Sequence, residues 1–181
     1  MKQIGGYVKI TGGTYRGRSI QTPGGNTHPM GERERLALFN MIFDCVNDSQ
    51  VLDLFCGGGT LGIEALSRGA KSVTFVDNSG KVMAVVKKNC LDLEINSEKW
   101  KTVVLDANSF AMASKNQYDL VLADPPYDTY TPEMVENLPK LVKQGGTLVL
   151  SHPGAAPDFS EMQLLKARKY ANANLSIYIK R

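Results

Sequence analysis

The stretch Val51-Leu52-Asp53-Leu54-Phe55-Cys56-Gly57-Gly58-Gly59-Thr60-Leu61-Gly62 decides the fold. An apolar run passes directly into a glycine-rich turn, and residues 60–68 continue with the spacing of a helix. We interpret this order as a strand, a glycine loop and a helix. Glycines let the backbone approach a ligand closely, and the first turn of a helix presents unpaired N–H groups. Such a loop also suits a dinucleotide, so other residues have to identify the ligand.

An acidic residue follows the second apolar run of the chain. Residues 72–76 lead into Asp77, 20 positions after Gly57, and Asn78 comes next. In a doubly wound fold, an acid at about this spacing accepts hydrogen bonds from ribose hydroxyls. The glycine loop and Asp77 together predict a nucleoside site at the ends of the first two strands.

Apolar runs and helical patterns alternate along most of the chain. We expect strands at 51–55, 72–76, 101–105, 119–123 and 147–151, helices at 60–68, 79–93, 107–115 and near 131–143, and closing runs at 164–170 and 174–179. This alternation predicts an α/β fold with a Rossmann-like, doubly wound, mostly parallel seven-stranded sheet. Only about four residues separate the closing runs, which permits a hairpin but no parallel crossover. The last strand is therefore expected to run antiparallel to the rest.

The residues before this alternation form a basic leader. Short strands at 7–10 and 18–21 predict a β-hairpin, and residues 32–46 have helical spacing. We divide the chain into a hairpin extension at 1–28 and a Rossmann-like domain at 29–181. Residues 1–35 hold six basic and two acidic residues, whereas the whole chain has a net charge of only +3.

This excess of positive charge favours an arm that faces the phosphates of a nucleic acid. The candidate RNA-binding residues are Arg16, Arg18, Arg33 and Arg35. Two alternatives stay open: Arg16 and Arg18 could belong to a solvated hairpin, and Arg35 could pair with a carboxylate of the core.

The four residues Asp124-Pro125-Pro126-Tyr127 directly follow the apolar run 118–123. Two prolines remove two backbone donors and leave the carbonyls before and between them free to accept from a substrate N–H. Asp124 can accept the second hydrogen of the same amine, and Tyr127 offers a flat face for a base taken out of its stack. This is the chemistry needed to methylate a nucleobase amine. Alone, these residues would also fit an ordinary turn at a strand end.

Composition agrees with one compact enzyme. A chain of 181 residues with 43% hydrophobic and 22% charged residues is ordinary for one globular domain with a small extension. The sequence has neither an apolar run of about 18 residues nor an apolar signal core after Met1, so we expect a cytoplasmic protein without a membrane partner. Three cysteines and two histidines are too scattered to indicate a disulfide framework or a metal site.

Four segments in order, residues 10–18, 29–40, 52–70 and 124–127, resemble the RsmD-type 16S ribosomal RNA guanine-N2 methyltransferases. The similarity covers nearly the whole chain. It implies the class I S-adenosylmethionine-dependent methyltransferase fold, S-adenosylmethionine as methyl donor, and the exocyclic N2 amine of a guanine in small-subunit ribosomal RNA as acceptor. The implied partner is 16S ribosomal RNA or the assembled small subunit, and we expect the enzyme to be a monomer.

Carried over by motif, the resemblance implies two groups of site residues. Those at the methyl donor are Asp53, Phe55, Gly57, Gly59, Asp77, Asn78, Asp106 and Ala107, and the catalytic ones are Asp124, Pro125, Pro126 and Tyr127. Two of these have competing roles. Asp106 can cap the helix that starts at Ala107, and Asp53 can order the glycine loop by hydrogen bonding. Ser151 departs from the family pattern, which often has an acidic residue at its position.

Two other functions remain open at this point. The first is an adenine N6 methyltransferase acting on DNA or RNA, because Asp-Pro-Pro-Tyr suits adenine equally well. Against it, the chain contains no sizeable segment for a target-recognition domain. The second is a catalytically silent nucleic-acid-binding module that keeps the fold, against which the intact Asp53, Asp77 and Asp124 argue.

Overall fold

The computed structural model describes residues 5–24, 30–170 and 174–181. Its strands are β1 Tyr7–Lys9, β2 Ser19–Gln21, β3 Gln50–Leu54, β4 Ser72–Asp77, β5 Trp100–Val104, β6 Tyr118–Ala123, β7 Val142–His152, β8 Met162–Lys169 and β9 Asn174–Lys180. Its α-helices are α1 Glu32–Met41, α2 Thr60–Ser67, α3 Gly80–Asp92 and α4 Ala107–Ala113. Short 3₁₀ turns are η1 Phe43–Cys45, η2 Ser97–Lys99, η3 Tyr127–Thr129, η4 Pro132–Met134 and η5 Leu138–Leu141.

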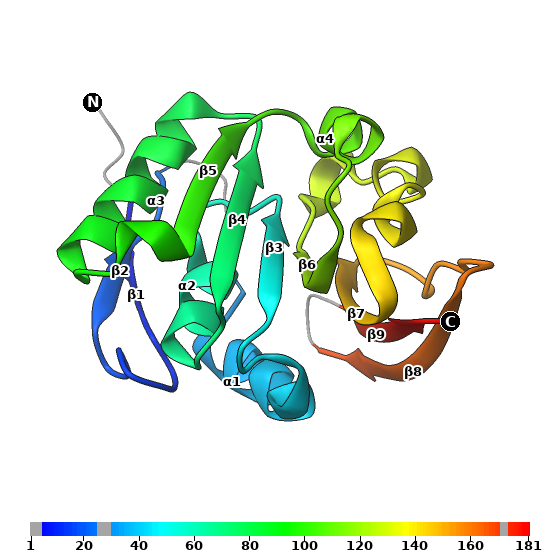
Figure 1. The fold of residues 1–181 in the computed structure, drawn as a ribbon, viewed down its shortest axis with the longest axis horizontal. Helices are drawn as coiled ribbons and strands as arrows, with labels where there is room; N and C mark the ends of the chain where they lie inside the picture. The colour runs from blue at the N-terminus through cyan, green and yellow to red at the C-terminus, as the bar shows by residue number, and fades with distance from the viewer. Residues whose placement is uncertain (1–4, 25–29, 171–173) are drawn as a thin grey trace.

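A seven-stranded sheet with the order β5-β4-β3-β6-β7-β9-β8 forms the centre of the molecule (Figure 1). The strands from β3 to β7 are parallel, and β9 pairs antiparallel with both β7 and β8. The predicted mostly parallel sheet with an antiparallel last strand is confirmed. The predicted hairpin is also confirmed, because β1 and β2 form a separate antiparallel pair. The predicted domain boundary between residues 28 and 29 lies outside the described residues.

The helix predicted near residues 131–143 is wrong. The chain instead forms η4 and η5, and β7 begins at Val142 rather than at residue 147. Pro132 and Pro139 lie in these two turns. Each proline lacks a backbone N–H and disfavours the helical conformation in the residue before it, so a continuous helix cannot form. The helix predicted at 32–46 is also shorter, since α1 ends at Met41 and η1 follows.

Side chains that alternate across the sheet form two cores. On one face, which we call the α1 face, α1, α2 and α3 pack with the hairpin residues Ile10 and Ile20 against strand residues such as Leu122. On the other, the α4 face, α4 and the loop residue Phe159 pack against the intervening strand residues. Helices on both faces are what a doubly wound sheet requires, since its parallel strands are buried on both sides. Among the described residues, no helix is both long and apolar enough to cross a membrane.

A buried carboxylate joins the hairpin to the helices. Glu64 in α2 is 0% exposed, and its Oε2 accepts from the Thr11 backbone N–H at 2.9 Å and from Arg35 Nε at 3.1 Å. Its Oε1 accepts from the Thr11 hydroxyl at 2.7 Å and from Arg68 Nε at 2.9 Å. Because a buried charge needs several partners to offset its lost hydration, these four contacts explain how Glu64 is accommodated.

The structure corrects the prediction that Arg35 contacts RNA. Its side chain is 1% exposed, and besides Glu64 it donates to the backbone carbonyls of Lys9 and Met30. All three guanidinium nitrogens donate within the protein and the side chain is buried, so its charge is not presented to a phosphate. The alternative weighed for Arg35, pairing with a core carboxylate, is the one found.

We predict that Arg35→Ala lowers the free energy of unfolding by about 3 kcal/mol, because it removes one partner of a buried ion pair while Arg68 still faces Glu64. Urea denaturation followed by circular dichroism measures this loss. Arg33→Ala is the matched control, since Arg33 is exposed on the same helix and its loss should change stability by less than about 0.5 kcal/mol. Equal effects of the two substitutions would contradict a structural role for the Arg35–Glu64 pair.

Candidate active site

Most of the predicted site residues lie at the carboxyl ends of the parallel strands. Asp53 and Phe55 lie at the end of β3, Asp77 ends β4, and Asp124 follows β6. Because β3 pairs in parallel with both β4 and β6, these ends meet at one edge of the sheet. Ligands of open α/β sheets bind at this edge, near the point where the strand order reverses. Here that point lies between β3 and β6, from which the chain winds outward in both directions.

The glycine loop turns sharply from β3 into α2. Gly59 precedes the first residue of α2 with φ of 77°, and Gly57 has φ of 49°, a backbone region that favours glycine. A Cβ atom on Gly57 would meet no heavy atom within 4 Å, so the space in front of this backbone is open. A Cβ on Gly58 would instead come within 2.9 Å of Pro23 in the leader. One side of the loop is thus packed, and the other can receive a ligand.

Asp77 holds the glycine loop from the neighbouring strand. Its Oδ2 accepts from the Gly57 N–H at 3.1 Å, and its Oδ1 accepts from the Ser79 N–H at 3.0 Å. A carboxylate offers about four acceptor positions, so these two bonds leave capacity for further hydroxyl donors. Asp77 is partly exposed, and the adjacent Asn78 is exposed. Both therefore remain accessible to a ligand at this edge.

Asp53 is 1% exposed, and its Oδ2 accepts from the Gly62 N–H in the first turn of α2 at 2.8 Å. Burial raises the pKa of Asp53 well above its usual value, and the nearby Asp124 and Asp77 carboxyls raise it further, while the Gly62 N–H opposes them. This contact supports the loop-ordering role that was one of its two predicted functions. Contact of Asp53 with a ligand stays a prediction.

Asp106 is the N-cap of α4, and its Oδ1 accepts from the Ser109 N–H at 2.9 Å. Hydrogen bonds from Ser109 lower the pKa of this exposed carboxyl. The capping role weighed for Asp106 is therefore present. Ala107, the first residue of α4, is 8% exposed. Whether either residue also contacts a ligand stays a prediction.

The four residues after β6, Asp124 to Tyr127, differ in how far they are exposed. Pro125 is buried, Pro126 is exposed, and Asp124 and Tyr127 lie between these extremes. The Tyr127 hydroxyl is hydrogen-bonded to the hydroxyl of Ser151, which is buried in β7. Ser151 also hydrogen-bonds Asp124. Because an ionised carboxylate can only accept, Ser151 donates to Asp124 and accepts from Tyr127.

The surroundings of Asp124 raise its pKa to about 6. Burial is the main cause, the negative charge of Glu34 adds to it, and the hydrogen bond from Ser151 opposes it. Burial likewise raises the pKa of Tyr127 to about 12, so this phenol stays protonated at neutral pH. Asp124 is thus ionised near pH 7 but close to its midpoint, as expected of a carboxylate at a functional site.

The sequence did not predict two residues that act on Asp124, namely Ser151 and Glu34. Ser151 was recognised only as a departure from a family pattern, because its contact with Tyr127 joins residues 24 positions apart. Glu34 lies in the first turn of α1, where its Oε2 accepts from the Gly31 N–H at 3.3 Å. No motif marks Glu34; only the packing of α1 along the sheet brings its charge toward Asp124.

The hairpin is attached directly to the glycine loop. The side chain of Asn89 in α3 donates to the carbonyls of Gln21 at 2.8 Å and Gly58 at 3.0 Å, and it accepts from the Gln21 N–H at 2.9 Å. Arg16 and Arg18 are exposed on this hairpin, although one Arg18 nitrogen donates to the Asp92 carbonyl at 3.1 Å. Arg16 and Arg18 therefore face solvent on a hairpin that is hydrogen-bonded to the glycine loop through Asn89, and Arg33 is exposed on α1.

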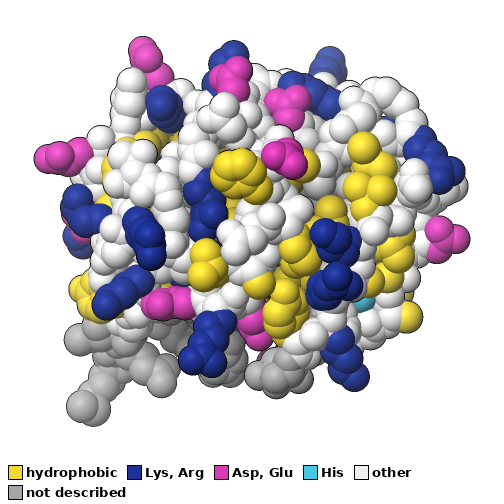
Figure 2. Space-filling model, turned by 90° about the horizontal axis from the view of Figure 1, so that it is seen from below, with side chains coloured by type: hydrophobic (Ala, Val, Ile, Leu, Met, Phe, Trp, Pro, Cys, Tyr) yellow, Lys and Arg dark blue, Asp and Glu magenta, His cyan; other side chains and the backbone are white. Residues whose placement is uncertain are grey.

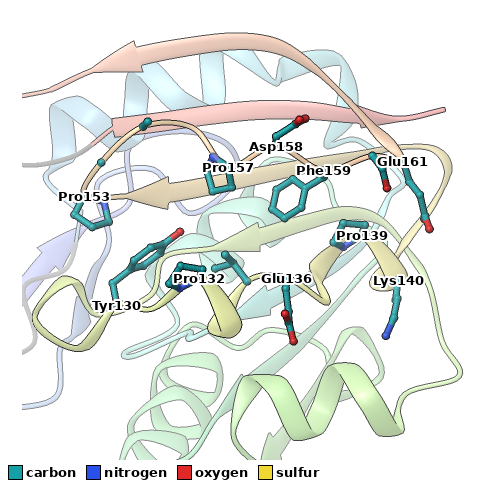
Figure 3. A pocket seen from close by; sticks show the side chains of 14 residues that line it. Tyr130, Pro132, Glu136, Pro139, Lys140, Pro153, Pro157, Asp158, Phe159 and Glu161 are labelled. Atoms are coloured by element: carbon teal, nitrogen blue, oxygen red, sulfur yellow. The ribbon is translucent and has the colours of Figure 1, made fainter.

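A cavity of about 770 Å³ lies away from these residues (Figure 3). Its walls come from residues 130–140 and 153–161, and Figure 3 shows Tyr130 and Pro132 on one side with Pro157 and Phe159 on the other. The glycine loop and Asp124 are not part of these walls. The candidate active site is therefore identified by the convergence of side chains at the sheet edge rather than by this hollow. Within the described residues, no cluster of three or more His, Cys, Asp or Glu has the arrangement of a metal site.

Comparison with known proteins gives a consistent picture. The family described as conserved hypothetical protein 95 matches residues 8–179. A Haemophilus influenzae protein named ribosomal RNA small subunit methyltransferase D is 37% identical over 125 residues, which cover 67% of this chain and 65% of that protein. The protein of the same name from Escherichia coli is 34% identical, and the match covers 67% of this chain and 61% of the relative. The aligned part thus spans less than two thirds of these two relatives.

Other similarities extend over nearly the full chain. A Bacillus subtilis protein named putative rRNA methyltransferase YlbH is 28% identical over 183 residues, covering 96% of this chain and 100% of that protein. The solved structure of putative methyltransferase yhhF from Escherichia coli superposes with a TM-score of 0.86 at 27% identity, covering 97% of this chain and 99% of that one. These matches confirm the predicted methyltransferase fold and the resemblance to the RsmD type.

We predict that the Asp124 carboxyl titrates near pH 6 and that Ser151→Ala raises this pKa, because the substitution removes a hydrogen bond that favours the charged form. Carbon NMR of protein labelled at its aspartate carboxyls follows the titration. Ser109→Ala is the control: it should raise the pKa of Asp106 and leave that of Asp124 unchanged. A lower Asp124 pKa in the Ser151 variant would mean that the hydroxyl does not donate to the carboxylate.

Proposed function

The chain belongs to the conserved hypothetical protein 95 family, and on this basis we propose that it transfers a methyl group from S-adenosylmethionine to a guanine N2 amine in 16S ribosomal RNA of the small subunit. The names of its relatives from Haemophilus influenzae and Escherichia coli support ribosomal RNA of the small subunit as the substrate. The observation that carries the proposal is the arrangement of Asp124, Pro125, Pro126 and Tyr127 beside the glycine loop. We further propose a monomeric, cytoplasmic enzyme.

The residues at the ends of β3 and β4 fit S-adenosylmethionine. The open backbone at Gly57 would border the methionine part, and the remaining acceptor capacity of Asp77 suits the two ribose hydroxyls. Phe55, with φ of 60°, and Gly59 shape the turn that exposes this backbone. Asn78, Asp106 and Ala107 lie at the ends of β4 and β5, where the adenine would extend.

Asp124 and the proline turn would act on the acceptor amine. The lone pair of a guanine amine is delocalised into the ring, so the amine is a poor nucleophile. When Asp124 and a carbonyl of the turn each accept one amine hydrogen, the nitrogen can become pyramidal and its lone pair is freed. Once the nitrogen carries the methyl group, Asp124 would take up the proton that it loses. Tyr127 would hold the base plane, and a base stacked on an aromatic ring gains about 1 to 3 kcal/mol.

The protein's main task would be alignment in a water-poor site. When bound, S-adenosylmethionine supplies an electrophilic methyl group. Ser151 holds both Asp124 and the Tyr127 hydroxyl, so the acceptor carboxylate and the stacking ring keep one relative orientation. Fixing two reactants in an attacking geometry removes much of the entropic barrier of a bimolecular reaction. Asp124 must be ionised to accept, so the rate should fall as the pH drops below about 6.

The acceptor base can be identified in cells. Mass mapping of modified nucleosides in 16S ribosomal RNA from cells lacking this protein should show the loss of one N2-methylguanosine. Loss of an N6-methyladenosine instead would establish the second candidate function, an adenine methyltransferase, which Asp124 to Tyr127 would serve equally well. An unchanged nucleoside map would remove small-subunit ribosomal RNA as the substrate.

We predict that substitutions at two aspartates affect different steps, catalysis for Asp124 and S-adenosylmethionine binding for Asp77. Asp124→Ala should lower kcat about a hundredfold, a change of about 3 kcal/mol in the barrier, and leave S-adenosylmethionine affinity within a few-fold. Asp77→Ala should weaken S-adenosylmethionine binding because it removes the acceptor for the ribose hydroxyls, without changing which base is methylated. Calorimetry and single-turnover kinetics separate the two effects. Unchanged turnover in the Asp124 variant, or unchanged affinity in the Asp77 variant, would remove that residue from its role.

We also predict that Arg16→Gln with Arg18→Gln weakens RNA binding, because both side chains are exposed on the hairpin. The slope of log affinity against log salt should become shallower by nearly one for each lost phosphate contact. Filter binding over a range of salt concentrations measures this slope. S-adenosylmethionine affinity is the internal control and should not change. Weaker binding with an unaltered slope would mean that the hairpin acts through shape rather than charge, and no change at all would fit a merely solvated hairpin.

A further inference from the structure

The edge strand β8 is exposed along nearly its whole length. Its first residue, Met162, is buried, whereas residues 163–169 are all exposed. It pairs with β9 on one side and forms the end of the sheet on the other. The strand carries Lys166, Arg168 and Lys169 and no acidic residue. β8 is thus an exposed edge strand whose charged residues are all positive.

Strand register places two of these charges on the α1 face. Arg168 pairs with Leu175, and Lys166 pairs with Ile177; both β9 residues belong to the core on the α1 face. Lys169 pairs with Asn174, the next residue along β9, so its side chain points to the opposite, α4 face. The same strand therefore presents Lys166 and Arg168 on one face and Lys169 on the other.

The row that contains Arg168 leads straight to the candidate active site. Arg168 pairs with Leu175 in β9, and Leu175 pairs with Ser151 in β7. Ser151 in turn contacts Tyr127 and Asp124. Two strand spacings separate Arg168 from Ser151, about 10 Å in the direction across the sheet. Lys166 lies in the next row on the same face, beside Ile177 and Val149.

The view from below in Figure 2 faces the side of the molecule where α1 and β8 lie in Figure 1. Lys and Arg side chains are spread over this side, on the left where the hairpin lies and on the right where β8 lies. In the part of the chain that the structure describes, Lys166 and Arg168 form no ion pair, in contrast to Lys143 and Lys180. Their charges are therefore available to a partner in solution.

We propose that Lys166 and Arg168 form a second RNA-binding surface, which holds backbone phosphates a few nucleotides from the methylated base. This inference rests on the proposed function, because it takes the partner to be the RNA substrate. Charge complementarity selects the partner: unpaired cations beside a site for a base match a phosphate backbone. The hairpin lies on the other side of α1 from β8 (Figure 1). The hairpin and β8 together would therefore hold the RNA on both sides of the target nucleotide.

A competing explanation is that lysines protect an exposed strand from pairing with another sheet edge. That explanation requires charge on the strand but no particular face, so it treats Lys169 as equal to Lys166 and Arg168. The RNA-binding proposal distinguishes them, because at physiological salt the screening length is about 8 Å and charges on the far face contribute little. Lys169 is therefore a matched control on the same strand.

The test compares Lys166→Gln with Arg168→Gln, as a double variant, with Lys169→Gln and the unchanged protein. The substrates are 16S ribosomal RNA and small subunits from cells that lack the enzyme. For the double variant, we expect a several-fold higher KM for RNA, an unchanged kcat and unchanged S-adenosylmethionine affinity. The salt slope of RNA binding should become shallower by about one for each lost contact. Lys169→Gln should behave like the unchanged protein.

Three results would overturn the proposal. Equal effects of the double variant and Lys169→Gln would show that the two faces are not distinguished. Weaker binding to assembled subunits alone, with an unaltered salt slope, would point to a ribosomal protein as partner. Association of the double variant in sedimentation, with RNA affinity intact, would establish the edge-protection role. If the unchanged protein methylates neither substrate, the proposed function itself is wrong. If it methylates them and the substitutions at Lys166 and Arg168 change nothing, only the proposed RNA-binding surface is wrong.

Discussion

The buried Glu64 carboxylate determines how the parts of this molecule are held together. It lies in α2 and accepts from Thr11 in the leader, from Arg35 in α1 and from Arg68 at the end of α2, so three elements share one charge. Removing a carboxylate from water is costly, and only a nearly complete set of donors offsets that cost. The arrangement therefore tolerates little displacement of any partner. As a result the hairpin and the first turn of α1, with Glu34, are fixed relative to the glycine loop.

The carboxylates at this edge of the sheet differ in burial and in pKa. Asp53 is buried and its pKa is raised well above its usual value, which suits a residue that organises α2 rather than one that exchanges with solvent. Asp124 remains partly exposed with a pKa of about 6, because burial and Glu34 oppose the Ser151 hydroxyl. A carboxylate balanced in this way is ionised at neutral pH yet poorly hydrated. In the proposed reaction it would accept strongly from an amine that displaces its remaining water, since hydrogen bonds to charged acceptors are about twice as strong as neutral ones.

The alternating fold was predictable because its signals are local. Apolar runs, the glycine loop and Asp77 report on neighbouring residues, and the short gap before β9 sets its direction. The failures have long-range causes. The pattern at 131–143 looked helical, but Pro132 and Pro139 permit only short turns. Arg35 looked like part of a basic arm until its burial against Glu64, 29 residues away, was known. Ser151 is an unremarkable strand residue until β7 lies beside β6, where it meets Tyr127.

The mixed sheet of this small chain leaves one edge strand, β8, exposed. Parallel strands need cover on both faces, which α1 to α4 provide over β3 to β6. In the antiparallel pair, β9 is still buried on both faces along its middle, and only the edge strand β8 is exposed. At this end of the sheet one row of paired residues runs from Ser151 through the buried Leu175 to the exposed Arg168. The edge position of β8 thus places an exposed basic residue in the same row as Ser151 of the candidate active site.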